Sequence, residues 1–168
     1  ITNLSTGKTG IQLADLFLQM GFDVTLIKAK KSNVDNLSSE VQIINFETFS
    51  DLSNVLHKEL SKNIYDTVIH AAAVSDYSIA SISDGKSNKS NLKSISKNKS
   101  DSIPESKLSS DAFELTLKLT RNPKLIDEIK NWRRNKKVKL IGFKMTATKN
   151  KNLQTDAVEK LFRHSMAD

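Results

Sequence analysis

The chain has 168 residues, of which 38% are hydrophobic, and this length suits one domain of ordinary size. It contains no cysteine, which excludes a disulfide scaffold, a thiol nucleophile and a cysteine-ligated zinc site, and it lacks the roughly 18 consecutive apolar residues of a membrane span. Lys and Arg outnumber Asp and Glu by 26 to 19, and the resulting net charge of +7 favours anionic partners such as nucleotides, phosphorylated metabolites or nucleic acid.

Helical and strand periodicities alternate along most of the chain. Apolar residues three and four apart indicate helices, and short apolar runs indicate strands. The predicted elements are a helix at 11–20, strands at 24–27 and 41–46, a helix at 49–60, strands at 67–73 and 113–119, a helix at 122–132, a strand at 138–141 and a helix at 156–166. Because strands that alternate with helices form βαβ units, the expected fold class is α/β, a Rossmann-like, doubly wound, largely parallel sheet.

Residues 81–110 break this pattern. The stretch is rich in Ser, Lys and Asn and has few apolar side chains, so it cannot bury enough surface to order itself well. A loop of this length inside a compact domain is usually functional or disordered. We therefore expect one nucleotide-binding domain over residues 1–168, with residues 81–110 as a mobile flap loop within it.

Residues 3–10 place glycines and hydroxyls ahead of the first predicted helix. Backbone N–H groups in such a loop can surround a phosphate. The segment contains Gly-Lys-Thr, but no glycine stands five residues before Gly7, where a Walker P-loop needs its first glycine, and no G-x-G-x-x-G is present. A phosphate site and a simple glycine-containing helix start both remain open.

Three further groups of residues are candidates for binding. Asp76 follows small residues at the carboxyl end of a predicted parallel strand, where it would bind a ribose hydroxyl, help hold a metal, or only cap a turn. Residues 122–125 begin a predicted helix, with Asn122 as its N-cap and Pro123 at its first position, and would meet an anion or a base edge or serve only as a cap. Lys160 and His164 lie one helical turn apart, which suits a triphosphate or an ordinary solvated face.

Five segments, taken in order, resemble the phosphopantothenate–cysteine ligase (phosphopantothenoylcysteine synthetase) family. Each segment is weak evidence alone, but the ordered set spans nearly the whole chain, and the likeness is greatest to the stand-alone bacterial form. The segments are residues 1–7 (ITNLSTG), 72–77 (AAVSDY), 107–110 (KLSS), 116–129 with its Asn-Pro pair, and 141–143 (IGF).

The resemblance implies a ligase of coenzyme A biosynthesis. Members activate the carboxylate of 4′-phosphopantothenate with CTP and Mg²⁺, release pyrophosphate, and let the amine of cysteine attack the acyl-cytidylate to give the amide and CMP. A reaction of this kind needs cations and N–H donors where charge develops, and it needs no protein nucleophile. We also expect a homodimer in the cytoplasm, with no nucleic-acid or membrane partner.

The resemblance also implies roles for individual residues, while the ligands of the metal stay unknown. Asn3 matches the asparagine that holds the acyl intermediate, and Lys107 matches the lysine of the mobile loop. The nucleotide-binding set is Asp76, Lys107, Asn122, Pro123, Lys124, Leu125, Phe143, Lys160 and His164, where the family often has lysines at the last two. The substrate- and phosphate-binding set is Ser5, Thr6, Gly7, Ala72 and Ala73.

Two departures and two rival functions accompany this interpretation. The family has a strand and a Gly/Thr-rich loop ahead of its asparagine segment, so we expect further residues before Ile1, and also after Asp168. Without that strand, a central sheet edge would lie open.

The rival functions are a nicotinamide-dependent Rossmann-type reductase, for which the glycine fingerprint is missing, and a nucleic-acid-binding module, for which the Lys-rich loop lacks aromatic residues for base stacking.

Overall fold

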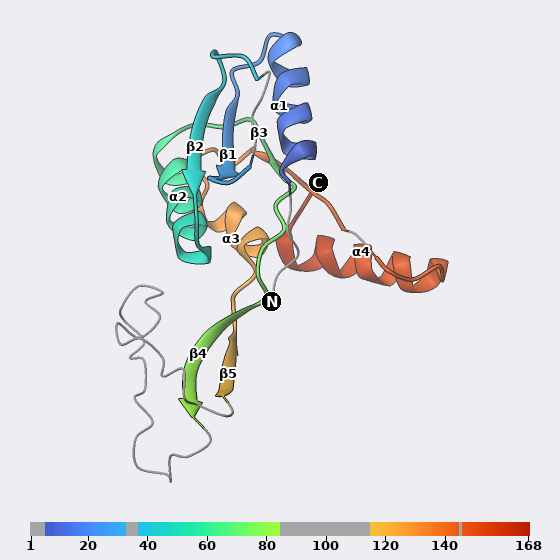
Figure 1. Cartoon of the computed structure of the whole chain (residues 1–168). Coiled ribbons are helices and arrows are strands. Elements are labelled where there is room, and N and C mark those ends of the chain that lie inside the picture. The colour runs from blue at the N-terminus through green and yellow to red at the C-terminus, as the bar shows by residue number, and fades with distance from the viewer. Residues whose placement is uncertain (1–5, 33–36, 85–114, 145) are drawn as a thin grey trace. The chain divides into compact units, whose positions relative to one another are not determined.

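The computed structural model describes residues 6–32, 37–84, 115–144 and 146–168 (Figure 1). The chain divides into two compact units, which we call the hairpin unit (residues 1–2 and 75–123) and the core unit (residues 3–74 and 124–168). No helix in these described ranges is long and apolar enough to cross a membrane. The elements in chain order are α1 (Lys8–Gln19), β1 (Thr25–Ala29), β2 (Gln42–Phe46), α2 (Phe49–Lys62), β3 (Thr67–His70), β4 (Tyr77–Asp84), β5 (Leu115–Arg121), α3 (Leu125–Trp132), β6 (Lys139–Gly142) and α4 (Lys151–Ser165).

The strands of the core unit run parallel, as predicted for an α/β fold. β1 pairs with β2 from Thr25 opposite Gln42 onward, and β3 pairs with β6 up to His70 opposite Gly142. Among the described residues these ladders form two separate parallel pairs. The fold class predicted from the alternation of helices and strands is confirmed by these parallel pairs, because parallel neighbours need long crossover connections, and the one from β3 to β6 contains α3.

The start of α2 shows how local sequence fixes a helix boundary. The Thr48 hydroxyl accepts a hydrogen bond from the Asp51 backbone N–H (3.1 Å), and an Asp51 carboxylate oxygen accepts one from the Thr48 N–H (3.0 Å). This reciprocal capping box satisfies two N–H groups that the helix itself leaves without partners. The backbone hydrogen bonds also lower the pKa of the Asp51 carboxyl.

The core unit is held by two buried clusters in which α2 and α3 pack together. Trp132 is partly buried and contacts both clusters, so it joins them. Such continuous burial supplies most of the stability of a domain of this size. The buried residues of the first cluster are Leu60, Ile126, Ile129 and Leu140, and those of the second are Leu52, Leu56 and Leu125.

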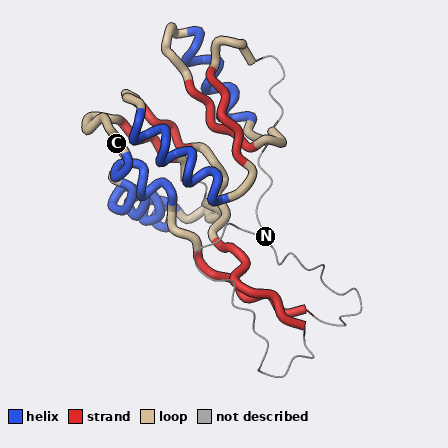
Figure 2. Tube along the Cα trace, turned by 90° about the vertical axis from the view of Figure 1, so that its left-hand side faces the viewer, coloured by secondary structure: helices blue, strands red, loops and turns tan. Residues whose placement is uncertain are grey.

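The hairpin unit is built on an antiparallel pair, β4 and β5 (Figure 2). A bulge at Ala80 shifts the register between Ile79 and Ser81. Because side chains alternate along a strand, the bulge returns Ile82 to the same face as Ile79. No strand was predicted at the position of β4, and the expected loop from residue 81 was wrong for residues 81–84, which continue the strand. The rest of the predicted flap loop, residues 85–110, lies outside the described residues.

Two predicted helix starts were also wrong. α3 begins at Leu125 with Lys124 as its N-cap, not at Asn122 and Pro123, because the Asn122 side chain makes hydrogen bonds elsewhere. α4 begins at Lys151, ahead of the predicted start at residue 156, because the Asn150 side chain accepts hydrogen bonds from two N–H groups of its first turn. A cap of this kind begins a helix even where its first turn is polar and shows no apolar period.

Candidate functional site

The turn that carries Asp76 is held in place by Asn122, which is 8% exposed. The Asn122 amide nitrogen donates to the Ser75 carbonyl (3.0 Å), and its amide oxygen accepts a hydrogen bond from the Ser78 hydroxyl (2.7 Å). The Asn122 backbone N–H donates to the Asp76 carbonyl (2.9 Å). We call this set of three hydrogen bonds the Asn122 clamp; it brings together two predicted nucleotide-site residues, Asp76 and Asn122.

The clamp fixes the backbone on both sides of Asp76. Ser75 adds a hydrogen bond from its own hydroxyl to the Tyr77 carbonyl (2.7 Å), while the side chains of Asp76 and Tyr77 are exposed. An aspartate on a backbone held in this way has a defined position at low entropic cost when it meets a ligand. The Asn122 side chain therefore acts on the turn, because both of its polar atoms are hydrogen-bonded to Ser75 and Ser78.

In the core unit, β3 and β6 end side by side, and two predicted site segments follow them. His70 lies opposite Gly142 in the last register position, and Ala72 and Ala73 follow β3 as exposed small residues. Burial lowers the pKa of His70 to about 4, so this end of the sheet holds a neutral imidazole at pH 7. Phe143 comes directly after β6 and is 55% exposed, as an aromatic that stacks on a base must be.

Gly142 lets the helices approach the end of β6. A Cβ atom at this position would lie 2.8 Å from the Ile126 Cδ1 and 3.3 Å from the Leu161 Cδ2. The glycine thus permits α3 and α4 to pack against the strand immediately before Phe143.

The start of α1 contains Thr6 and Gly7, two residues of the predicted phosphate-binding set. Gly7 has φ +74°, in the left-handed region that favours glycine, and a Cβ there would lie 2.9 Å from the Ser32 Oγ. The first turn of the helix has no acidic residue, and the Lys8 N–H donates to the Thr6 hydroxyl (3.4 Å). Because the first N–H groups of a helix carry partial positive charge, this end suits an anion.

The remaining predicted residues occupy different environments. Lys160 and His164 are exposed on α4, one turn apart as predicted. The Leu125 side chain is 2% exposed and packs in the core, so any contact with a nucleotide would be made by its backbone. Asn3, Ser5 and Lys107 lie outside the described residues. Nowhere in the described ranges do three His, Asp or Glu side chains gather as a metal site would require.

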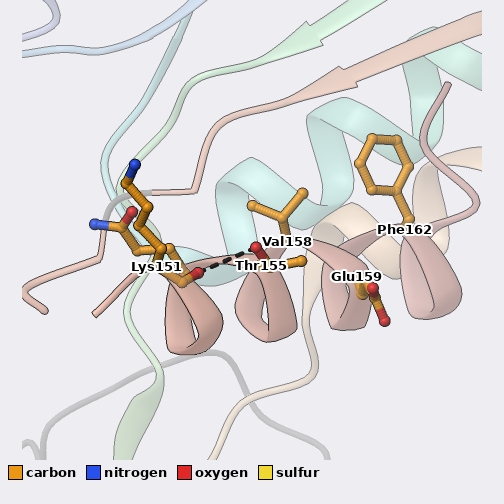
Figure 3. Close-up of a pocket in the computed structure, with 6 residues that line it drawn as sticks. Lys151, Thr155, Val158, Glu159 and Phe162 are labelled. Atoms are coloured by element: carbon orange, nitrogen blue, oxygen red, sulfur yellow. Dashed lines mark hydrogen bonds between the residues drawn. The ribbon is translucent and has the colours of Figure 1, made fainter. Parts of the chain in front are cut away.

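A shallow hollow of about 480 Å³ lies on α4 alone (Figure 3). Val158 and Phe162 point to the same side of the helix there, while the Glu159 carboxylate points away. Its lining residues are Lys151, Gln154, Thr155, Val158, Glu159 and Phe162. None of these is a predicted site residue, and a hollow on the face of a single helix lacks the converging polar groups that a small-molecule site needs.

Comparison with known proteins gives consistent matches. The family model of the DNA/pantothenate metabolism flavoprotein C-terminal domain matches residues 1–103. The coenzyme A biosynthesis bifunctional protein CoaBC of Methanocaldococcus jannaschii is 32% identical over 169 residues, covering 99% of this chain and 34% of that protein. The protein of the same name from Thermococcus kodakarensis is 32% identical over 144 residues, covering 86% of this chain and 29% of that protein.

A solved structure matches over the whole chain. The DNA/pantothenate metabolism flavoprotein from Streptococcus pneumoniae has a TM-score of 0.78 and 26% sequence identity, with 100% of this chain and 71% of that chain covered. This likeness supports the Rossmann-like α/β class. The chain spans about a third of the length of the curated relatives named above.

Proposed function

Because the chain belongs to the family of the DNA/pantothenate metabolism flavoprotein C-terminal domain, we propose that it joins 4′-phosphopantothenate to cysteine in coenzyme A biosynthesis. The names of the curated relatives, coenzyme A biosynthesis bifunctional proteins, support this pathway. The single structural observation that carries the proposal is the Asn122 clamp on the turn of Asp76, the turn whose sequence resembles the nucleotide motif of the ligases. A stand-alone enzyme, as opposed to part of a bifunctional one, remains a prediction.

In the proposed reaction, a carboxylate oxygen of 4′-phosphopantothenate attacks the α-phosphorus of CTP, and the bond to pyrophosphate breaks. The cysteine nitrogen then attacks the acyl carbon, loses a proton, and CMP leaves with the electron pair of the acyl–oxygen bond. Mg²⁺ would neutralise triphosphate charge when bound, and the exposed Asp76 carboxylate is the described residue that suits the ribose or that metal. Phe143 would stack on the cytosine, and Asn3 and Lys107 keep their proposed roles at the acyl carbonyl and the phosphates.

The first prediction tests the nucleotide. We expect pyrophosphate release with 4′-phosphopantothenate to be at least tenfold faster with CTP than with ATP, since one base-specific contact is worth roughly 1.4 kcal/mol or more. The measurement is a coupled pyrophosphate assay with each nucleotide at equal concentration. Equal or faster release with ATP contradicts the cytidine assignment.

Two further binding measurements on the same protein test the two rival functions. A nicotinamide-dependent reductase predicts tight binding of NADPH by calorimetry, with no pyrophosphate release from either nucleotide. A nucleic-acid-binding module predicts retention on DNA that weakens steeply with salt, because counterions are released on binding. Either result, found together with no CTP-dependent turnover, would contradict the ligase function.

We also propose that the enzyme is a homodimer, and the support is the apolar face of the β4–β5 pair. An isolated two-stranded hairpin is marginally stable in water and normally needs a further strand or packed surface. One face of this pair carries residues that are 43–55% exposed, and the opposite face is polar. The exposed apolar residues are Tyr77, Ile79, Leu115, Leu117 and Leu119. A second copy would offer the same face, as a two-fold symmetric interface requires.

The second prediction follows from this face. Leu117→Lys would place a charge in the proposed interface, and we expect the molar mass measured by light scattering to fall from that of a dimer to that of a monomer. Thr116→Lys adds the same charge to the polar face and should leave the dimer intact. A Leu117→Lys protein that stays dimeric excludes this face as the interface.

A further inference from the structure

The positive charge of the chain is concentrated in one stretch. Residues 129–155 contain nine of the 26 Lys and Arg residues and none of the 19 Asp and Glu residues. This stretch therefore carries more positive charge than the net +7 of the whole chain. Like charges that gather in this way repel each other in the folded protein until a partner of opposite charge neutralises them. The nine residues are Lys130, Arg133, Arg134, Lys136, Lys137, Lys139, Lys144, Lys149 and Lys151.

Part of this stretch lies at the amino ends of β3 and β6. The two strands begin together, with Thr67 opposite Lys139, and Phe143 of the proposed nucleotide site follows β6 at the other end. The loop of residues 133–138, which leads into β6, therefore lies at the end that the proposed reaction does not use. Its cations need an explanation other than substrate binding.

The loops that lead into β3 and β6 are joined by hydrogen bonds. An Arg134 guanidinium nitrogen donates to the Lys62 carbonyl (2.8 Å). The Asn135 amide nitrogen donates to the Tyr65 carbonyl (2.9 Å), and the Asn135 amide oxygen accepts from the Lys137 N–H (2.9 Å). The two loops thus form one surface with a well-defined backbone.

Four exposed cations and an exposed isoleucine lie on these two loops, and we call this set the basic platform. Its residues are Lys62, Ile64, Arg134, Lys136 and Lys137. None of the four cations forms an ion pair with a carboxylate of the residues that the structure describes. Ile64 is 68% exposed, the largest exposed fraction of any large hydrophobic side chain in the described ranges. An apolar side chain together with surrounding charges is typical of a protein interface, which has an apolar centre and a polar rim.

The acidic residues of this region are engaged with other groups. The Glu59 carboxylate accepts hydrogen bonds from the Tyr65 hydroxyl (2.9 Å) and the Asn63 amide nitrogen (2.7 Å). The Asp66 carboxylate lies 3.5 Å from the Asn135 amide nitrogen, which donates to it. These contacts leave the cations of the basic platform without a counterion from their own loops.

The dipoles of the preceding helices account for only part of this charge. A helix carboxyl end favours cations, and this explains Lys62 in the last turn of α2, but the effect falls off within one turn. Lys136 and Lys137 lie more than one turn beyond Trp132, where α3 ends. Their position therefore indicates an external anionic partner.

We propose that the basic platform docks an acidic protein segment that carries an apolar side chain among its carboxylates. Ile64 packs against that apolar side chain, and the four cations pair with the carboxylates. Nucleic acid suits the platform less well, because phosphate contacts make no use of Ile64 and the platform offers no aromatic side chain for base stacking. An anionic membrane also suits it less well, because one isoleucine buries little apolar area in a bilayer.

The third prediction compares two pairs of exposed lysines in the same basic stretch. A copolymer of glutamate and tyrosine is the probe for an acidic segment with apolar side chains. We expect the double variant Lys136→Glu, Lys137→Glu to bind it at least about tenfold more weakly, because attractive pairs become repulsive. The double variant Lys149→Glu, Lys151→Glu has the same net charge, with the changes placed after β6, and should bind it within about twofold of the unaltered protein, since salt screens distant charges.

A single variant tests the apolar centre. Ile64→Ser should abolish the preference that we expect for the copolymer over poly-glutamate. All five substituted side chains are exposed, so the variants should unfold at the temperature of the unaltered protein. The measurement is fluorescence anisotropy of labelled polymers, titrated with the full chain at physiological ionic strength and without CTP. Binding is thus tested independently of the ligase activity.

Several results would overturn the proposal. A simple effect of net charge predicts equal losses in the two lysine pairs and tighter binding of poly-glutamate, which has more carboxylates per residue; either result contradicts docking at the platform. Failure of the unaltered protein to bind the copolymer contradicts it as well. Tighter binding of double-stranded DNA or of phosphatidylserine vesicles than of the copolymer, lost in Lys136→Glu, Lys137→Glu, would assign the platform to a nucleic acid or a membrane instead.

Discussion

Replacing Asn122 by Ala is expected to lower kcat/KM for CTP about 100-fold, because a displacement of roughly 1 Å at a catalytic site has an effect of this size. The variant removes the donor to the Ser75 carbonyl and the acceptor for the Ser78 hydroxyl, so both sides of the Asp76 turn lose their support. Leaving these groups without partners also costs about 1–3 kcal/mol of folding free energy. Steady-state kinetics and urea unfolding of the same variant measure the two effects separately.

Asn135 offers a matched control in the core unit. Its amide nitrogen donates to the Tyr65 carbonyl (2.9 Å), and its amide oxygen accepts from the Lys137 N–H (2.9 Å), so both of its polar atoms are hydrogen-bonded, as those of Asn122 are. Asn135→Ala should destabilise the fold by a similar amount and leave the KM for CTP unchanged. If Asn122→Ala affects stability alone, to the same extent as Asn135→Ala, the clamp is structural and the Asp76 turn is not part of the nucleotide site.

The clamp also shows why sequence reasoning wrongly interpreted Asn122 as the cap of a helix. Asparagine before proline is a common helix start, and local propensity therefore favoured a cap. Its actual partners, Ser75 and Ser78, lie more than forty residues earlier in the chain, at separations of 47 and 44. No local pattern contains such a contact, because it depends on β4 and β5 pairing first.

The core unit was easier to predict because its signals are local. Apolar periodicity identified α1, α2 and the parallel strands, since burial of one face or of a whole strand dictates which positions are apolar. β4 was missed because its polar face is made of serines, which made the segment resemble the Ser-rich stretch that follows.

Lowering the pH from 6.5 to 4 should remove about 3 kcal/mol of folding free energy through His70 alone. Burial lowers its pKa from 6.5 to about 4, so between these values the unfolded chain binds a proton that the folded protein does not. Stability is therefore intact above pH 6.5 and is lost progressively as the pH falls. The carboxyls of Asp51 and Asp168, whose pKa values are lowered by hydrogen bonds, lose their contributions only below their ordinary pKa of 3.8, outside this window.

His70→Leu, which replaces the imidazole by a side chain that cannot titrate, should flatten the dependence of stability on pH between 6.5 and 4. Urea unfolding at half-unit pH intervals measures this, and His164→Gln, at an exposed position of α4, is the control that should keep the slope of the unaltered protein. The imidazole lies at the shared end of β3 and β6, where Gly142 faces it, so its protonation would place a charge inside the sheet just before Phe143. If His70→Leu keeps the same slope, His70 is protonated in the folded protein without penalty, and the acid sensitivity has another source.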